Sequence, residues 1–173
     1  MDDVIEKAKA VLASTPGRWL LLVDHLPGDL LERPPAEGEW SALACLRHLL
    51  AAERRLYPAR VRAFLEGRDF EPFDPKKEGQ DAGGQTPREL VEEFVGRRAE
   101  SVRVLETLNE SDLSRTARHP DLGRVTLREM LHTWAAHDLM HTRQAEQALM
   151  QPFVEGCGPW QGFFTGHVMN ATE

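Results

Sequence analysis

The stretch TLREMLHTWAAHDLMHTRQ, residues 126–144, carries a strong helix signal. Thr126 followed three residues later by Glu129 is a capping box, which starts a helix at the next residue. Apolar residues then recur at helical spacing on one face, and His137 and His141 lie on that same face because they are four residues apart. The pattern therefore predicts a long helix that buries this face, with two histidines stacked on it.

Three further segments show the same kind of pattern, and together they predict an all-α four-helix bundle. The expected helices span residues 2–13 with a separate segment at 16–25 after the interruption STPGRW, 41–67 with a kink near 54 caused by Pro58, 87–108, and 127–150 with Pro152 as the stop. The loops at 68–85 and 109–125 are long enough to permit an order other than up-down-up-down. The Gly-rich aromatic tail after Pro152 is expected to pack as short irregular pieces.

Length and composition are typical of one globular domain spanning residues 1–173. The net charge of −7 argues against binding of nucleic acid as the main task. No apolar run is long enough to span a membrane, and the acidic N-terminus lacks the hydrophobic region of a secretory signal. Two cysteines, Cys45 and Cys157, make no disulfide framework. These features predict a cytoplasmic protein whose partners are neither nucleic acid nor membranes.

The histidines His137 and His141 are the first candidates for a functional site. Unpaired polar groups on a buried face cost roughly 1–3 kcal/mol each, so these two imidazoles need partners. A divalent metal would satisfy both, and so would hydrogen bonds within the core. His48 lies in an apolar part of the 41–67 segment. If the two helices are neighbours, all three imidazoles can converge on a metal and leave a position open for water or substrate.

Several polar residues near these histidines have two interpretations each. Gln144, three residues after His141, could hold a bound water or substrate, or could be a polar residue at the end of the bundle. Glu53 points away from His48 and is a poor co-ligand. It could orient a histidine from a neighbouring helix, but pairing with an arginine is favoured. Cys45 could be a ligand or nucleophile, but a small core residue is favoured. Asp138 either supports a ligand or faces solvent.

Aromatic residues suggest where other contacts form. Trp40 precedes Ser41, a candidate N-cap, and is placed to pack on Cys45 as a hydrophobic staple. The loop 68–85 and the tail are candidates for covering the entrance to a substrate-binding site or for forming a dimer surface. The tail aromatics in question are Phe153, Trp160, Phe163 and Phe164.

Two blocks of sequence resemble the DinB-like superfamily of helical bundles. EWSALACLRHLLAAE, residues 39–53, is similar to the family's "WS…HL…E" opening, and HPDLGRVTLREMLHTWAAHDLMHTRQ, residues 119–144, is similar to its second half. The resemblance implies a four-helix bundle in up-down-down-up order. It also implies a homodimer and a metal triad on three residues: His48, His137 and His141.

The chemistry implied by this resemblance is metal-dependent. A metal on three imidazoles with an open position can lower the pKa of bound water or hold a thiolate. The best interpretation is transfer of a low-molecular-weight thiol to an electrophile in detoxification or stress response, with metal-dependent hydrolysis as the nearest variant. Zinc is the first choice, while nickel, iron and manganese stay open. The competing hypothesis is a non-catalytic bundle with a structural or sensory metal, or with none.

Overall fold

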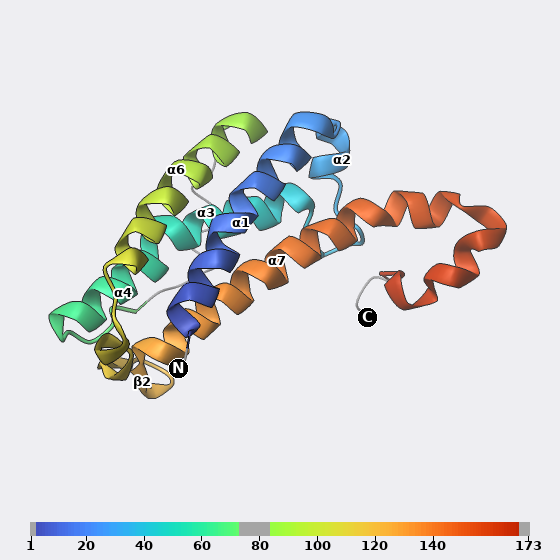
Figure 1. The fold of residues 1–173 in the computed structure, drawn as a ribbon. Helices are drawn as coiled ribbons and strands as arrows, with labels where there is room; N and C mark the ends of the chain where they lie inside the picture. The colour runs from blue at the N-terminus through green and yellow to red at the C-terminus, as the bar shows by residue number, and fades with distance from the viewer. Residues whose placement is uncertain (1–2, 73–83, 170–173) are drawn as a thin grey trace.

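The computed structural model describes residues 3–72 and 84–169, and long helices dominate it (Figure 1). The long elements are α1 (Val4–His25), α3 (Ala42–Arg55), α4 (Tyr57–Glu66), α6 (Pro87–Glu106) and α7 (Leu127–Gly156). The short elements are α2 (Gly28–Glu32), the 3₁₀ helices η1 (Glu110–Ser114) and η2 (Gly158–His167), and strands β1 (Thr116–His119) and β2 (Gly123–Thr126). The capping box predicted at Thr126 is present, and Thr86 forms a second capping box with Glu89 at the start of α6.

The helices α1, α3, α6 and α7 form a bundle. α1 packs against α6 and α7, and α3 packs against the same two helices. Along the chain, α1 runs up, α3 and α6 run down, and α7 runs up again (Figure 1). The all-α four-helix bundle in up-down-down-up order is therefore confirmed. Because α3 and α7 are neighbours, the two predicted histidine helices lie side by side.

α1 is one continuous helix, so the predicted interruption at STPGRW is wrong. Pro16 has no N–H to donate to the carbonyl of Leu12, four residues earlier. The Arg98 guanidinium on α6 supplies a donor instead, with 3.0 Å between Nη1 and the Leu12 oxygen. The Thr15 hydroxyl also donates to this carbonyl, at 3.3 Å. A tertiary contact thus satisfies the acceptor that the proline leaves unpaired, and the helix continues.

The other two helix-breaking prolines also act differently from the prediction. Pro58 lies in the first turn of α4, where its missing N–H costs no helical bond, and the chain breaks at Leu56 instead of kinking near residue 54. Pro152 lies inside α7, which continues to Gly156. Val154 remains buried in this last turn, and its burial offsets the hydrogen bond lost at the proline.

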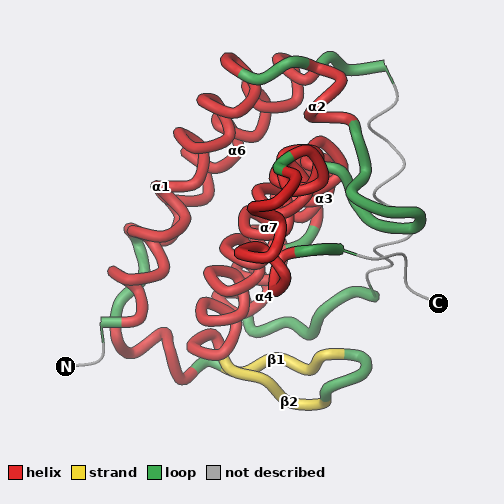
Figure 2. Tube along the Cα trace, turned by 90° about the vertical axis from the view of Figure 1, so that its right-hand side faces the viewer, coloured by secondary structure: helices red, strands yellow, loops and turns green. Residues whose placement is uncertain are grey.

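The segment 109–125, expected to be a loop, contains η1 and a β-hairpin. β1 and β2 pair antiparallel, from Thr116 opposite Thr126 to His119 opposite Gly123. Gly123 has φ of 75°, which glycine adopts without strain. The hairpin lies at the end of the bundle where α7 begins (Figure 2). Each strand has four residues and few buried positions, so no apolar alternation predicted it.

The core consists of two hydrophobic clusters. One contains Leu131 and Trp134, and the other contains Leu49 and Phe94, towards the opposite end of the bundle. Cys45 is fully buried in the second cluster, as predicted. Burial raises the pKa of its thiol to about 12, so the group is neutral and unreactive at pH 7.

The tail after α7 is not a set of irregular pieces but the 3₁₀ helix η2, with a local departure from helical geometry at Phe164. None of its side chains is buried, and the last turns of α7 and η2 extend past the other helices (Figure 1). Gln151 ties its end to α7, because Nε2 donates to the His167 carbonyl at 2.8 Å. The predicted role of this tail as a substrate cover or dimer surface stays a prediction.

Two further sequence-based expectations concern regions away from the core. Residues 73–83 of the predicted covering loop 68–85 lie outside the described residues. Among the helices that the structure describes, none combines the length and hydrophobicity needed to cross a membrane.

Candidate metal centre

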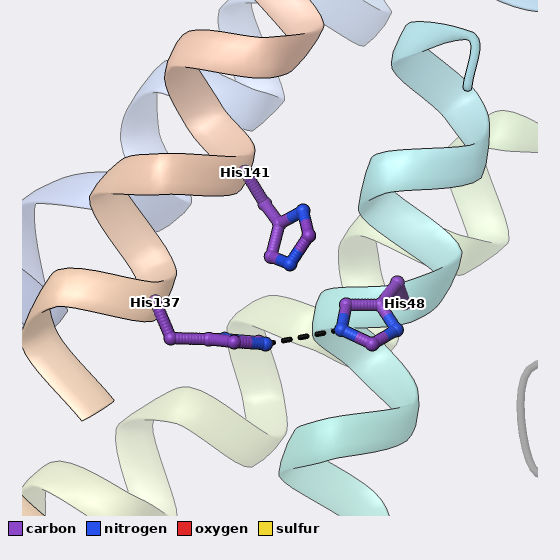
Figure 3. Close-up of side chains that lie close together, drawn as sticks. All are labelled: His48, His137 and His141. Carbon is purple, nitrogen blue, oxygen red and sulfur yellow. Dashed lines mark hydrogen bonds between the residues drawn. The ribbon is translucent and has the colours of Figure 1, made fainter. Parts of the chain in front are cut away.

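Three histidines meet between α3 and α7. His48 comes from α3, and His137 and His141 lie one turn apart on α7 (Figure 3). One ring nitrogen of each histidine lies within 4.8 Å of those of the other two. The Nε2 atoms of His48 and His137 are 3.0 Å apart. The structure therefore brings together all three histidines that the sequence singled out.

Local sequence fixes the position of each histidine along its helix. The Ser41 side chain accepts a hydrogen bond from the Ala44 N–H, which starts α3 and places His48 two turns inside it. Thr126 and Glu129 start α7 in the same way. Because both helix starts are capped, the histidines sit in regular helix with little freedom of the backbone.

Burial keeps the three imidazoles neutral. The pKa of His48 is lowered to about 4 and that of His137 to about 3, mainly because burial disfavours the charged ring. Repulsion from the neighbouring imidazoles lowers both pKa values further. Burial also lowers the pKa of His141, although its hydrogen bond to Gln144 opposes the shift. At pH 7 the cluster presents neutral nitrogens, which is the form that binds metals.

Gln144 selects the tautomer of His141. Nδ1 of His141 lies 2.9 Å from the amide oxygen of Gln144, which can only accept, so Nδ1 carries the proton. The Nε2 lone pair of His141 is then free, and Figure 3 shows a ring nitrogen of His141 turned towards the gap between the other two rings. Gln144 therefore contacts a candidate ligand rather than lying apart from the cluster.

The donor set and its spacing fit a divalent metal. Zinc bound to imidazole nitrogens at roughly 2.0–2.1 Å in a tetrahedral site separates those nitrogens by about 3.4 Å. The observed 3.0 Å between Nε2 of His48 and Nε2 of His137, and the 4.8 Å limit for the group, bracket that value. Among the residues that the structure describes, none hydrogen-bonds the buried Nδ1 of His137, and the hydrogen bond of this ring is made by Nε2, on the side facing the cluster.

Aromatic rings enclose the cluster. The indole of Trp40 stacks on His141, with 5.5 Å between ring centroids and 16° between planes, and lies 5.0 Å from His48. On the other side, Tyr57 contacts His137 edge-on at 5.3 Å and stacks on Trp134 at 5.0 Å. The sequence placed Trp40 in the packing around Cys45, and its contact with the histidines was not predicted.

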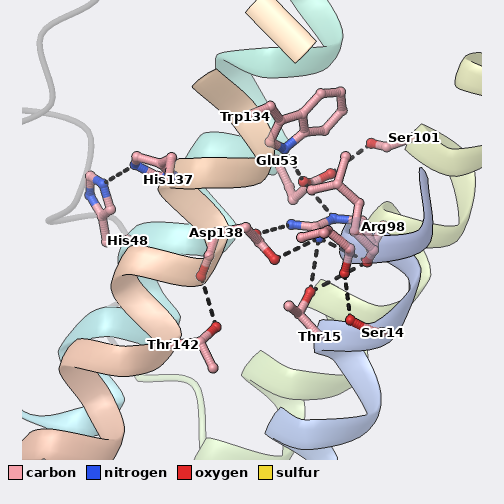
Figure 4. Close-up of polar contacts among 12 residues, drawn as sticks. Ser14, Thr15, His48, Glu53, Arg98, Ser101, Trp134, His137, Asp138 and Thr142 are labelled. Atoms are coloured by element: carbon pink, nitrogen blue, oxygen red, sulfur yellow. Dashed lines mark hydrogen bonds and ion pairs between the residues drawn. The ribbon is translucent and has the colours of Figure 1, made fainter. Parts of the chain in front are cut away.

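A second polar centre lies in the middle of the bundle, around Arg98 (Figure 4). Its Nε donates to Glu53 at 2.8 Å, and its Nη1 and Nη2 donate to Asp138 at 3.1 and 2.6 Å. Nη1 also reaches Thr15 at 3.0 Å. Ser101 donates to the second oxygen of Glu53 at 2.6 Å. We call this set of residues, with Leu12 and Trp134, the Arg98 network.

The Arg98 network joins the four helices of the bundle, α1, α3, α6 and α7. Leu12 and Thr15 belong to α1, Glu53 to α3, and Arg98 and Ser101 to α6. Asp138 and Trp134 belong to α7, and the Trp134 indole donates to Glu53 at 3.2 Å. The predicted pairing of Glu53 with an arginine agrees with this structure, and Asp138 is buried rather than facing solvent. Sequence reasoning missed Arg98, although it falls four residues after buried Phe94 on the apolar stripe of α6.

The fold and the cluster together define a class: a four-helix bundle with three convergent histidines between two of its helices. The family model described as the DinB superfamily matches residues 12–145, which is most of the chain. The chain belongs to the DinB superfamily, as the two sequence blocks predicted.

Two solved structures resemble this one. YfiT from Bacillus subtilis gives a TM-score of 0.77 at 21% identity, with 88% of this chain and 89% of YfiT covered. YfiT is described as a probable metal-dependent hydrolase with an unusual four-helix bundle topology. The DinB-like protein YjoA from Bacillus subtilis gives a TM-score of 0.58 at 20% identity, with 85% and 92% covered. At these identities the likeness concerns the fold alone. No curated protein gives a significant match to the sequence.

Proposed function

We infer that the chain is a metal-dependent enzyme whose divalent ion is held by His48, His137 and His141. The observation that carries this proposal is the convergence of three neutral ring nitrogens within 4.8 Å. Three protein ligands leave a coordination position for a nucleophile, as in catalytic zinc sites. We propose that this nucleophile is a low-molecular-weight thiol, transferred to an electrophilic small molecule, with water and hydrolysis as the nearest variant.

For this chemistry the ion would supply Lewis acidity and an affinity for sulfur. A bound ion of the zinc type lowers the pKa of coordinated water to roughly 7 and stabilises a thiolate in the same way. The residues of the chain prepare the site for that role. Gln144 holds the His141 tautomer, and the enclosing rings of Trp40 and Tyr57 lower the local dielectric constant. Zinc is our first choice of metal because it accepts both nitrogen and sulfur ligands.

Two observations favour an enzyme over a structural metal site. Structural zinc sites are usually closed by four ligands and are rich in cysteine. Among the described residues, the group around His48 that could hold a metal consists of histidines alone, and Cys45 is buried in the core. The description of YfiT as a probable metal-dependent hydrolase agrees with an enzymatic role and favours the hydrolytic variant.

Metal analysis tests the proposal first. Protein purified without an affinity tag or chelator is compared with a His137→Ala/His141→Ala double variant by plasma mass spectrometry. His132→Ala is the matched control, because His132 is an exposed histidine on the same helix. We expect about one metal per chain in the wild type and in the control, and none in the double variant. A wild-type protein that neither contains nor takes up metal would refute the proposal.

Activity assays then separate the two reactions. The same proteins are incubated with a set of electrophiles, with and without a thiol, and separately with a set of esters and amides. Thiol transfer predicts thiol consumption that stops in the double variant and after removal of the metal. Hydrolysis predicts turnover without thiol and with the same dependence on the histidines. A metal-loaded protein that is inactive in both sets would favour a structural or sensory metal.

A further inference from the structure

Trp40 is the exposed member of the aromatic shell around the histidine cluster. Tyr57, on the other side of the cluster, is 3% exposed and packed in the core, whereas Trp40 is 39% exposed. Trp40 precedes the N-cap of α3 and so lies outside the helices that supply the histidines. At this exposure Trp40 is not a core residue, and its role follows from the rings that it contacts.

The contacts of Trp40 indicate that role. Its ring is nearly parallel to His141 on α7 and is tilted against His48 on α3. One side chain therefore restrains two imidazoles that come from different helices. The His48 and His141 rings are themselves in contact, with their centroids 4.5 Å apart. Without the indole, both imidazoles would gain rotamer freedom at the edge of the cluster that solvent reaches.

We propose that Trp40 is a positioning residue, which holds His48 and His141 in the converging arrangement and shields their nitrogens from solvent. Outer-shell groups that hydrogen-bond metal ligands fix ligand orientation, and their loss typically weakens metal affinity roughly 10–100-fold. We expect the stacked indole to have an effect of similar size. Trp40 fixes the orientation by ring stacking, whereas Gln144 does so by a hydrogen bond to the same His141. The expected effect of Trp40 on metal affinity rests on the proposed function, whereas its effect on the orientation of the two imidazoles does not.

Metal affinity measures the first consequence. Trp40→Ala, Trp40→Phe and wild type are compared for Zn²⁺ affinity by competition with a chelating dye. We expect Trp40→Ala to bind Zn²⁺ roughly 10–100-fold more weakly and Trp40→Phe to recover most of the loss, because a phenyl ring can still stack. Trp160→Ala is the matched control, since Trp160 is exposed on η2. Equal affinity in Trp40→Ala and wild type, or no recovery in Trp40→Phe, would overturn the proposal.

Spectroscopy separates positioning from general stability. The Co²⁺-loaded proteins are compared by visible absorption, which reports coordination geometry, and the metal-free proteins by thermal unfolding. We expect the Co²⁺ spectrum to change in Trp40→Ala while the melting temperature without metal stays close to that of Trp160→Ala. A fall in affinity that is matched by a large loss of metal-free stability would mean that Trp40 is only a structural residue.

A measurement without metal keeps the inference independent of the proposed function. In proton NMR of the metal-free protein, the ring protons of His141 should be shifted by the ring current of the stacked indole, and Trp40→Ala should abolish this shift. If wild type binds no Zn²⁺ or Co²⁺, the proposed function fails, and the NMR comparison still decides whether Trp40 orders the histidines. Absence of the shift in wild type would refute the stacking itself.

Discussion

The bundle has two polar centres, the histidine cluster and the Arg98 network. They differ in the hydrogen-bond and ion-pair partners of their polar atoms. The Arg98 side chain is 2% exposed, Glu53 and Asp138 are fully buried, and the arginine donates to both carboxylates. In the histidine cluster, the rings are neutral; His48 and His137 are half-buried and contact each other, and His141 is buried and bonds Gln144. The charged groups of the Arg98 network pair with one another within the chain, whereas the histidine cluster has nitrogen lone pairs that can bind a ligand from outside the chain.

The two centres share their helices. Asp138 follows His137 directly on α7, and Glu53 lies five residues after His48 on α3. The Arg98 network therefore ties together the same two helices that supply the histidines, from the opposite side of α7 (Figure 4). The Arg98 network therefore fixes the distance between α3 and α7, and the convergence of the histidines depends on that distance.

The largest expected effect comes from breaking the Arg98 network. Arg98→Met removes the cation that pairs with the buried carboxylates of Glu53 and Asp138 and one of the two donors to the Leu12 carbonyl. This loss should cost about 3–5 kcal/mol of unfolding free energy, because two buried charges are left uncompensated. Urea unfolding measures this loss. Arg97→Met is the control, because the Arg97 side chain is 43% exposed and its pairing with Glu93 should contribute no more than about 1 kcal/mol. Similar losses in both variants would show that the network is not a special source of stability.

Zn²⁺ should raise the unfolding free energy of the protein through the histidine cluster and not through the Arg98 network. Zn²⁺ at about 100 times its dissociation constant should stabilise the wild type by about 2.7 kcal/mol, because it binds the folded state. Removal of Zn²⁺ by a chelator should reverse the gain. In the His137→Ala/His141→Ala variant, Zn²⁺ should leave the unfolding midpoint unchanged. A gain of the same size in that variant would place the metal elsewhere.

Acid should weaken the metal-free protein through the cluster. Folding lowers the pKa of His48 to about 4 and that of His137 to about 3, from about 6.5 in the unfolded chain. Below pH 6.5 the unfolded state therefore binds protons that the folded state does not, so stability falls as pH falls towards 4. At pH 5.5 the loss is at most about 1.4 kcal/mol for each histidine, and less because both rings are partly exposed.

Urea unfolding between pH 7 and pH 5.5 tests this pH dependence. A His48→Gln/His137→Gln variant should show a flatter profile over the same range. The range lies above the region in which Glu93, whose pKa is lowered to about 2 by its hydrogen bond with Arg54, begins to matter. An identical slope in both proteins would assign the acid sensitivity to other groups.

The smallest effect is expected at Cys45, one turn before His48 but on the core side. Cys45→Ala should leave the metal content unchanged, because the thiol is buried and neutral at pH 7. In the native wild type, a thiol reagent should modify Cys157 first, since it is only half-buried. Loss of metal in Cys45→Ala would make the thiol a ligand and contradict the three-histidine site.

The sequence by itself determined the local features. The capping residues Thr86 and Thr126 fixed where α6 and α7 begin, because cap hydrogen bonds form within four residues of the chain. Helical periodicity put His137 and His141 on one face, and together with two short motifs it predicted the family and the bundle. The metal assignment itself remains a prediction, supported by the convergence of the three rings.

Only the tertiary structure decided what depends on groups far apart in the sequence. Pro16 should have broken α1, yet Arg98 reaches across from α6 to satisfy the Leu12 carbonyl. The same arginine pairs with Glu53 and Asp138, and Trp40 stacks on His141, about a hundred residues later in the chain. Such contacts depend on how the four helices pack. The sequence pattern of one helix does not indicate which side chain of another helix will contact it.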